Sequence, residues 1–277
     1  MKRVLVFFIV IVASFSVLYP LESSKRFEYI KKTEGVFKTP ESVKYDSKRD
    51  MIYVANINGA PTDRDGNGFI SKLNSDGKVI DLKWIENLDA PKGMGIYNNY
   101  LYVTNIFEVV KIDIEESKII KRIDMKGTFL NDIDIDEEGN VYVSDMATKD
   151  IYIINEDDEY KKLYRDGSIV SRPNGLRVKE NYLYIGSSEY IFELNLDNMK
   201  LKKVAEGLKN TDGVVFTKNN NLVSSNFNGE LFYFNMNNNK LTGQKLNHGS
   251  ADIGIIAKDD ILLVPDFKKN VYFYRIK

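Results

Sequence analysis

The chain has 277 residues, with 39 Lys and Arg against 40 Asp and Glu, so its formal net charge is −1 and we expect no nucleic acid partner. It contains no cysteine, which excludes disulfides, thiolate metal sites, a cysteine nucleophile and lipid attachment at an N-terminal cysteine. Its single histidine, His248, excludes His-rich metal sites and leaves one candidate base for a Ser–His–Asp triad.

The N-terminal segment is typical of an export signal. Lys2 and Arg3 precede an apolar run over residues 4–20, after which the chain turns polar at Glu22. We therefore predict a signal peptide over residues 1–20 and an extracytoplasmic protein, either periplasmic or secreted. The alternative is an uncleaved membrane anchor, because the run approaches the length that spans a bilayer.

A short aliphatic and aromatic strand that ends in a small polar residue recurs along the chain. The six copies are IYVAN (52–56), LYVTN (101–105), VYVSD (141–145), LYIGS (183–187), LVSSN (222–226) and LLVPD (262–266). They begin 39 to 49 residues apart. A period of about 40 residues made of strands alone indicates a β-propeller.

Each copy follows an apolar strand and precedes a third strand and, in the first five units, a more polar fourth strand. The sequence therefore predicts an all-β, six-bladed propeller of four-stranded antiparallel blades, which occupies residues 27–277 as a single domain. The sixth unit stops at its third strand, at Lys277, and this would leave a sheet edge open. We predict that residues 27–35 supply the outer strand of the last blade and close the ring. We expect a monomer.

The first strand of each blade lines the central channel, so equivalent positions on these inner strands meet around the axis. The inner strands begin at Pro40, Pro91, Leu130, Pro173, Thr211 and Ser250, and this end of the channel is called the mouth below. The first aligned column contains Glu41, Lys92, Asn131, Asn174, Asp212 and Ala251. The next column contains Ser42, Gly93, Asp132, Gly175, Gly213 and Asp252.

The first column suggests a cation site. Its two carboxylates and two carboxamides repel or compete in a narrow channel unless a cation joins them. Oxygen ligands of this kind favour Ca²⁺, and we expect one divalent cation, with Mg²⁺, Mn²⁺ and Zn²⁺ as the alternatives to Ca²⁺. The other interpretation is a polar, water-filled channel in which Lys92 neutralises Glu41 or Asp212.

Four segments resemble the landmark segments of one protein family. PESVKYD, LNDIDIDEEGNVYVSD, RPNGL and TDGVVF are similar, in order and in blade, to those of the SMP-30/gluconolactonase/LRE-like family. The similarity runs through nearly the whole chain after residue 36. It implies a six-bladed propeller, in agreement with the repeat count.

The resemblance also implies a function. A divalent cation would be held by Glu41, Asn174 and Asp212, and Asp212 would also be the catalytic residue that transfers a proton. Asn131 and Asp132 would face the substrate. We therefore expect an extracytoplasmic, divalent-metal-dependent hydrolase of small-molecule lactones or esters, which contacts a membrane only if its N-terminal segment is not cleaved. A non-catalytic propeller that binds a peptide, glycan or envelope partner at the same mouth is the alternative, since propellers host many unrelated functions.

The chain departs from the family pattern at two places. The usual Glu-Gly-Pro opening is Glu41-Ser42-Val43, and an arginine that often precedes the Asn–Asp pair by two positions is Phe129. The loss of that arginine weakens the expectation of a polar sugar acid as substrate. Lys92 could bind substrate by stabilising a developing oxyanion. It could equally be a salt-bridge partner that keeps metal out.

Two further features receive plainer interpretations. Residues 60–69 (APTDRDGNGF) resemble the first half of an EF-hand Ca²⁺ loop, but Asn74 stands where the loop needs Glu. We interpret this segment as a Gly-rich connection at the rim of the mouth. His248 precedes the last inner strand and has no Ser–His–Asp spacing to support it, so we interpret it as a bystander.

Overall fold

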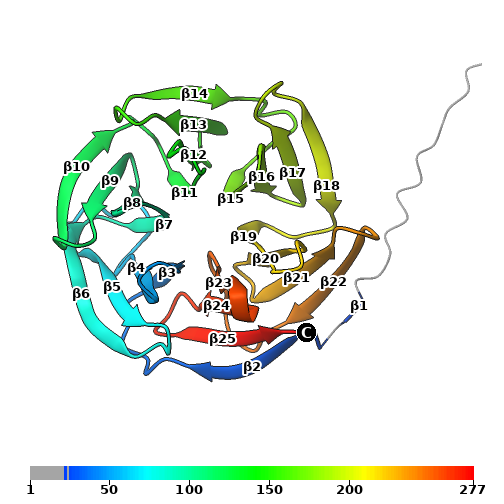
Figure 1. Cartoon of the computed structure of the whole chain (residues 1–277), viewed down its shortest axis with the longest axis horizontal. Helices are drawn as coiled ribbons and strands as arrows, with labels where there is room; N and C mark the ends of the chain where they lie inside the picture. The colour runs from blue at the N-terminus through cyan, green and yellow to red at the C-terminus, as the bar shows by residue number, and fades with distance from the viewer. Residues whose placement is uncertain (1–21, 24) are drawn as a thin grey trace, which may run out of the picture.

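The computed structural model describes residues 22–23 and 25–277, and the predicted signal peptide over residues 1–20 lies outside the described residues. Six β-sheets are arranged as blades around a central axis (Figure 1). The predicted all-β, six-bladed propeller is therefore confirmed. Among the described residues, no helix is long and apolar enough to cross a membrane.

The first three blades follow the chain. Blade one contains β3 (Pro40–Asp46), β4 (Met51–Asn56), β5 (Gly68–Asn74) and β6 (Val79–Leu88). Blade two contains β7 (Pro91–Tyr97), β8 (Tyr100–Asn105), β9 (Glu108–Asp113) and β10 (Lys118–Asp124). Blade three contains β11 (Leu130–Ile135), β12 (Val141–Asp145), β13 (Asp150–Ile154) and β14 (Tyr160–Tyr164).

The last three blades complete the ring. Blade four contains β15 (Pro173–Lys179), β16 (Tyr182–Ser187), β17 (Tyr190–Asn195) and β18 (Leu201–Glu206). Blade five contains β19 (Thr211–Phe216), β20 (Leu222–Asn226), β21 (Glu230–Asn235), β22 (Lys240–Lys245) and, at its edge, β1 (Glu22–Ser23). Blade six contains β23 (Gly254–Ile256), the 3₁₀-helix η1 (Ala257–Asp259), β24 (Ile261–Pro265), β25 (Val271–Ile276) and β2 (Phe27–Lys32).

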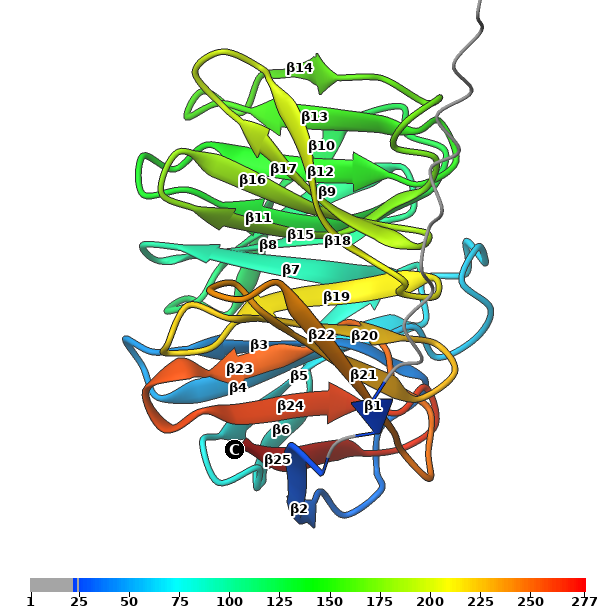
Figure 2. The same ribbon diagram turned by 90° about the vertical axis from the view of Figure 1, so that its right-hand side faces the viewer.

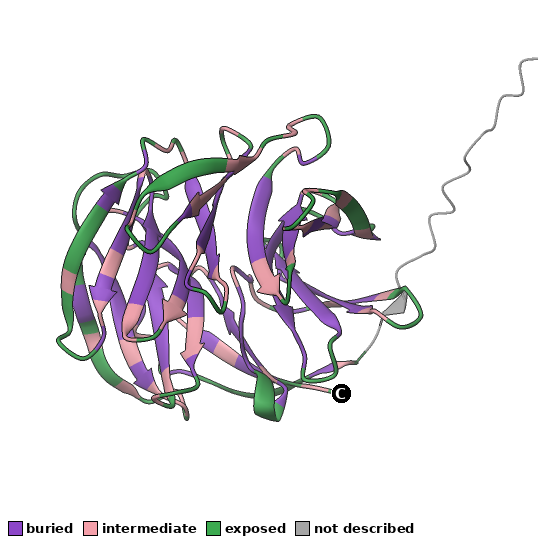
Figure 3. Cartoon of the chain, turned by 45° about the horizontal axis from the view of Figure 1, so that its top comes forward, coloured by how far each residue is buried: buried purple, intermediate pink, exposed green. Residues whose placement is uncertain are grey.

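Burial rises from the outer edge of each blade toward the axis (Figure 3). The inner strand β11 is buried over nearly its whole length, whereas the outer strand β14 of the same blade has no buried residue. The side chains of neighbouring blades pack face to face. Tyr53 and Trp84 of blade one, with ring centres 4.9 Å apart, belong to one cluster with Met94 and Val103 of blade two. Each blade therefore needs both neighbours to bury its faces.

The N-terminal strand closes the ring, as the sequence predicts. β2 pairs antiparallel with β25 and completes the four strands of blade six. Just before it, β1 pairs in parallel with β22, so the N-terminal segment lies along the outer edges of both blade five and blade six (Figure 2). The carboxamide of Gln244 accepts a hydrogen bond from the N–H of Phe27 at 2.9 Å and donates one to its carbonyl at 2.8 Å. These contacts tie the two blades together.

The last inner strand is shorter than the sequence predicts. It spans Gly254–Ile256, not residues 250–256. The reason is that Asp252 pairs with the first blade: its N–H donates to the carbonyl of Glu41 at 3.0 Å, and it forms a parallel bridge with Ser42. These backbone contacts join blade six to blade one at the axis.

We predict that Phe27 accounts for much of the closure energy. Phe27→Ala should cost about 3–5 kcal/mol in free energy of unfolding, because Phe27 is 3% exposed and packs among apolar residues of blades five and six. Ile30→Ala on the same strand is the matched control and should cost less than about 1 kcal/mol, since Ile30 is 39% exposed. Urea denaturation measures both. Equal losses would show that the strand does not seal the ring through Phe27.

Candidate functional site

Backbone irregularities place the first column of the channel. The pairing of the inner strand with the second strand shifts register at the start of five blades, next to Glu41, Lys92, Asn131, Asn174 and Asp212. A β-bulge re-aims a side chain and is common beside binding sites. The bulges therefore turn this column away from the regular alternation of the strands and toward the mouth.

Hydroxyl groups of neighbouring strands hold the carbonyls of this column. Thr104 and Ser144, each on the second strand of one blade, donate to the carbonyls of Asn131 and Asn174 on the next blade at 2.5 and 2.9 Å. Ser225 on β20 does the same for Ala251, while Ser42 donates to the carbonyl of Lys92 from the inner strand β3. The signal for Thr104, Ser144 and Ser225 was present in the recurring strands, three of which carry Ser or Thr one position before their last residue. Sequence reasoning did not assign them a role.

The three predicted cation ligands lie together and are buried. Glu41, Asn174 and Asp212 are 3%, 3% and 0% exposed, so none of them is solvated by bulk water. Within the described part of the chain, Oε2 of Glu41, Oδ1 of Asn174 and both carboxylate oxygens of Asp212 have no hydrogen-bond partner. Buried oxygens without a partner are costly. These three residues therefore fit a hard divalent cation, which would be bound by the same oxygens.

The electrostatics of the site agree with this fit. Burial raises the pKa of Glu41 well above its usual value, and Asp212 adds to this rise while Lys92 opposes it. Burial likewise raises the pKa of Asp212, with Asp132 adding to the rise. The carboxamide of Asn174 lies close enough to Asp212 to oppose that rise, although the two groups do not meet in a hydrogen bond of good geometry. A bound cation would remove this repulsion.

Lys92 does not pair with a carboxylate of the site. Its Nζ donates to the carbonyls of Pro61 and Ala90, both at 3.0 Å, and lies 4.7 Å from the ring centre of Phe129. Burial lowers the pKa of Lys92 to about 8, with Glu41 opposing the fall. The ammonium is thus held beside the cation ligands by neutral groups. One of its three protons is left for another acceptor.

The two residues predicted to face substrate separate. Asn131 is buried at the mouth, where its Nδ2 lies 4.0 Å from Sδ of Met146. Asp132 turns into the ring: one of its oxygens accepts from the N–H of Ile133 at 2.7 Å and the other from Leu176 of the next blade at 2.5 Å. Burial raises the pKa of Asp132 to about 7, although these two N–H groups oppose the rise. Asp132 therefore joins two blades, and Asn131 remains as the neutral polar group at the mouth.

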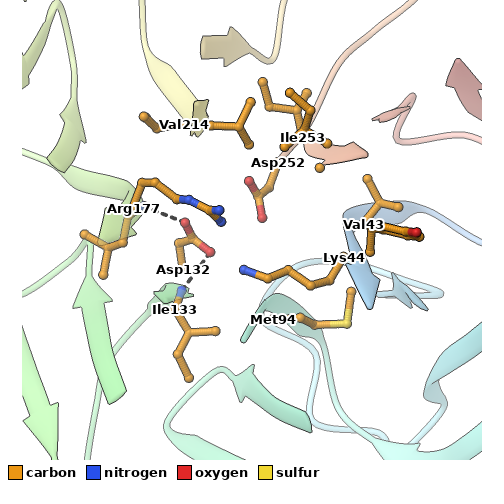
Figure 4. Close-up of a pocket in the computed structure, with 14 residues that line it drawn as sticks. Val43, Lys44, Met94, Asp132, Ile133, Arg177, Val214, Asp252 and Ile253 are labelled. Atoms are coloured by element: carbon orange, nitrogen blue, oxygen red, sulfur yellow. Dashed lines mark hydrogen bonds between the residues drawn. The ribbon is translucent and has the colours of Figure 1, made fainter. Parts of the chain in front are cut away.

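A small cavity lies in the channel beneath the first column. Its volume is about 90 Å³, and Figure 4 shows Asp132, Asp252, Lys44 and Arg177 pointing toward its middle. Lys44 bonds to Asp134 at 2.9 Å, and Arg177 lies 3.7 Å from the same carboxylate. Sequence reasoning did not single out these charges. The alignment carried their signal, because Lys44, Asp134 and Arg177 stand in one column of the inner strands.

The rim segment lies where the sequence places it. Residues 60–69 reach the mouth, as the bond from Lys92 to Pro61 shows. The carboxylates of the Ca²⁺-loop-like sequence bond within their own loop, Asp63 to the N–H of Ala60 and Asp65 to Asn67. No group of three or more His, Asp or Glu in the described residues is arranged to hold a metal. The site above is different in kind, because one of its three ligands is a carboxamide.

His248 lies between blades five and six. Its Nε2 is 2.7 Å from the hydroxyl of Tyr274, its Nδ1 is 2.6 Å from the carbonyl of Gly249, and its ring stacks on Tyr272 at 3.6 Å. Burial lowers its pKa. Both ring nitrogens are thus engaged with structural partners, away from the cation ligands.

Comparison with known proteins yields a structural likeness only. No family model matches the chain, and no curated protein matches it in sequence. Its fold is similar to that of a gluconolactonase from Xanthomonas campestris, with a TM-score of 0.72 over 93% of this chain and 97% of that one. The two sequences are 12% identical. At that identity the likeness establishes the shared fold.

We predict that Ca²⁺ stabilises the protein in a pH-dependent way. The raised pKa values of Glu41 and Asp212 mean that the cation-free native state loses stability as pH rises through them, because the buried carboxylates must ionise. Ca²⁺ at about 100 times its dissociation constant should add about 2.7 kcal/mol at pH 8. The gain should be smaller at pH 5, where protons compete for the same oxygens. Thermal melts with Ca²⁺ and with chelator measure the gain. A gain that persists in the double variant Glu41→Gln, Asp212→Asn would place the cation elsewhere.

Proposed function

We propose that the protein is an extracytoplasmic hydrolase of lactones or esters that depends on a divalent cation, with Ca²⁺ favoured. One observation carries the proposal. Four buried oxygens without partners belong to Glu41, Asn174 and Asp212, and these are the three residues that the sequence resemblance nominates as ligands. The similar fold of a gluconolactonase supports the lactone as substrate class.

The residues around these oxygens have suitable chemistry. A cation bound there would polarise a carbonyl and increase the acidity of a water molecule. Asp212, whose pKa is raised by burial, accepts the proton of the attacking water and returns it to the departing alkoxide oxygen. Water thereby adds across the cleaved C–O bond and a hydroxy acid forms from a lactone.

Two neighbours would assist at the carbonyl. Lys92 has an ammonium proton not used by Pro61 or Ala90, and it can stabilise the developing oxyanion. Asn131 can donate a hydrogen bond to substrate from the mouth, since the sulfur of Met146 is the one hydrogen-bond acceptor of its Nδ2 among the described residues. Asp132 acts indirectly, by fixing the backbone of the next blade through Leu176.

We predict that two substitutions separate binding from chemistry. Asp212→Asn keeps an oxygen ligand but removes the basic carboxylate, so it should retain most metal affinity and lower kcat by about two to four orders of magnitude. Glu41→Gln should weaken metal binding first, and excess cation should partly restore activity. Metal analysis and a panel of lactones and aryl esters, with and without chelator, measure both.

The control is Asp136→Asn, at a turn beyond the far end of β11, where Asn keeps the bonds from backbone N–H groups and loses only those from the side chains of Asn140 and Tyr142. It should leave activity unchanged. Full activity in Asp212→Asn would remove the catalytic assignment. A wild-type protein that binds no metal and hydrolyses nothing would favour the binding-module function.

A further inference from the structure

Three cationic side chains on one side of the mouth rest on aromatic or sulfur groups. The pairs are Arg64 with Phe107, Lys92 with Phe129, and Arg172 with Met146. The guanidinium of Arg64 lies 4.3 Å from its ring centre, and Nη2 of Arg172 lies 3.5 Å from the methionine sulfur. In the described chain none of the three forms an ion pair with a carboxylate. Four other arginines of the described chain do form ion pairs, as with Arg49 and Asp46 at 2.9 Å.

Of these three cationic residues, Arg172 lies nearest in sequence to a cation ligand. It is exposed and directly precedes β15, so only Pro173 separates it from Asn174. The sulfur of Met146 contacts both Nη2 of Arg172 and Nδ2 of Asn131, at 3.5 and 4.0 Å. The sulfur of Met146 thus lies between the guanidinium of Arg172 and the carboxamide of Asn131. A ligand that contacts Asn131 at the mouth is therefore within reach of Arg172.

The guanidinium of Arg172 keeps hydrogen-bond donors that a ligand can use. A contact with sulfur or with a ring face engages little of the hydrogen-bonding capacity of Arg, whose planar fork matches a carboxylate. Asp63 and Asp65, on either side of Arg64, bond within their own loop, and in the described chain they form no ion pair with Arg64 or Arg172. The guanidinium groups of Arg64 and Arg172 are therefore exposed on this side of the mouth, without an ion-pair partner among the described residues.

Two aromatic side chains lie on the opposite side of the mouth. Phe227 follows β20, is 42% exposed, and lies 5.8 Å from the ring of Phe267, which follows β24. Phe267 keeps this position despite a positive φ of 58°, a conformation that is costly for an aromatic residue. The mouth thus combines an apolar wall with an unpaired guanidinium.

We propose that the substrate is an apolar or aromatic ester or lactone that carries its own carboxylate, and that Arg172 binds this carboxylate. The proposal rests on the proposed hydrolase function and narrows its substrate class. Arg172 acts as a specificity residue: it contacts the substrate away from the scissile carbonyl. It should therefore affect KM for anionic substrates and leave kcat nearly unchanged.

The test compares matched substrates and matched variants. The substrates are 4-acetoxybenzoate and its neutral analogue 4-acetoxybenzamide, and the variants are Arg172→Gln and Arg165→Gln. Arg165 lies in the same connection between β14 and β15 but faces Asp150 at 3.3 Å, so it serves as the control. Wild type should favour the benzoate by roughly 10- to 100-fold in kcat/KM. Arg172→Gln should abolish this preference through KM, without changing the rate on the amide, and Arg165→Gln should retain it.

A binding measurement keeps the inference separate from hydrolysis. Benzoate and benzamide are titrated calorimetrically in the presence of chelator, so that no cation contributes to carboxylate binding. Tighter binding of benzoate that is lost in Arg172→Gln supports the inference even if no substrate is hydrolysed, in which case only the proposed hydrolase function fails. Equal binding of the two probes, or an unchanged preference in Arg172→Gln, overturns the inference while hydrolysis of the neutral ester leaves the hydrolase function intact.

Discussion

The close approach of the inner strands at the axis is the constraint on which the site depends. A Cβ atom on Gly175 would overlap the carbonyl oxygen of Asp212, and one on Gly213 would overlap the backbone N of Ile253. Backbones that approach so closely leave no space for side chains between the strands. The side chains just before these glycines, Asn174 and Asp212, must therefore turn toward the channel. Their proximity is a consequence of backbone packing as much as of their own chemistry.

The close approach of the inner strands also brings buried carboxylates near one another at the axis, where they repel when ionised. Glu41 and Asp212 come from blades that are brought together only when the ring closes, and each raises the cost of ionising the buried carboxylates around it. Closure by β2 and by the pairing of Asp252 with Glu41 and Ser42 must supply the free energy that holds them there. A ligand that neutralises the carboxylates would thus strengthen ring closure, which couples the site to global stability.

The sequence was sufficient for the fold because the repeat is physical. Each unit has one strand buried on both faces and one polar outer strand, and this pattern, repeated six times, leaves a single way to bury all the apolar faces. The first column followed from the same alignment. What the alignment could not give is the partner of each side chain: Asp132 stands in sequence beside Asn131 yet bonds to Leu176 of the next blade. The partners of Lys92 were equally hidden, since they are backbone carbonyls from two connections between strands, which no periodicity describes.

The two ends of the channel differ in how their charges are balanced. Beneath the first column, burial alone would raise the pKa of Asp134, yet Lys44 and Arg177 lower it overall, so the carboxylate stays ionised with partners from its own chain. At the mouth the nearest ammonium, that of Lys92, is occupied by carbonyls, and the oxygens of Asp212 lack a partner within the described residues. A carboxylate such as Asp134, which already has cationic partners within the chain, has little to gain from a ligand. The oxygens of Asp212 at the mouth lack such partners and gain most from a cation. Arg64 and Arg172 lie on the surface above them and form no ion pair among the described residues. An anionic substrate would therefore approach that cation from the side where its own charge is also matched.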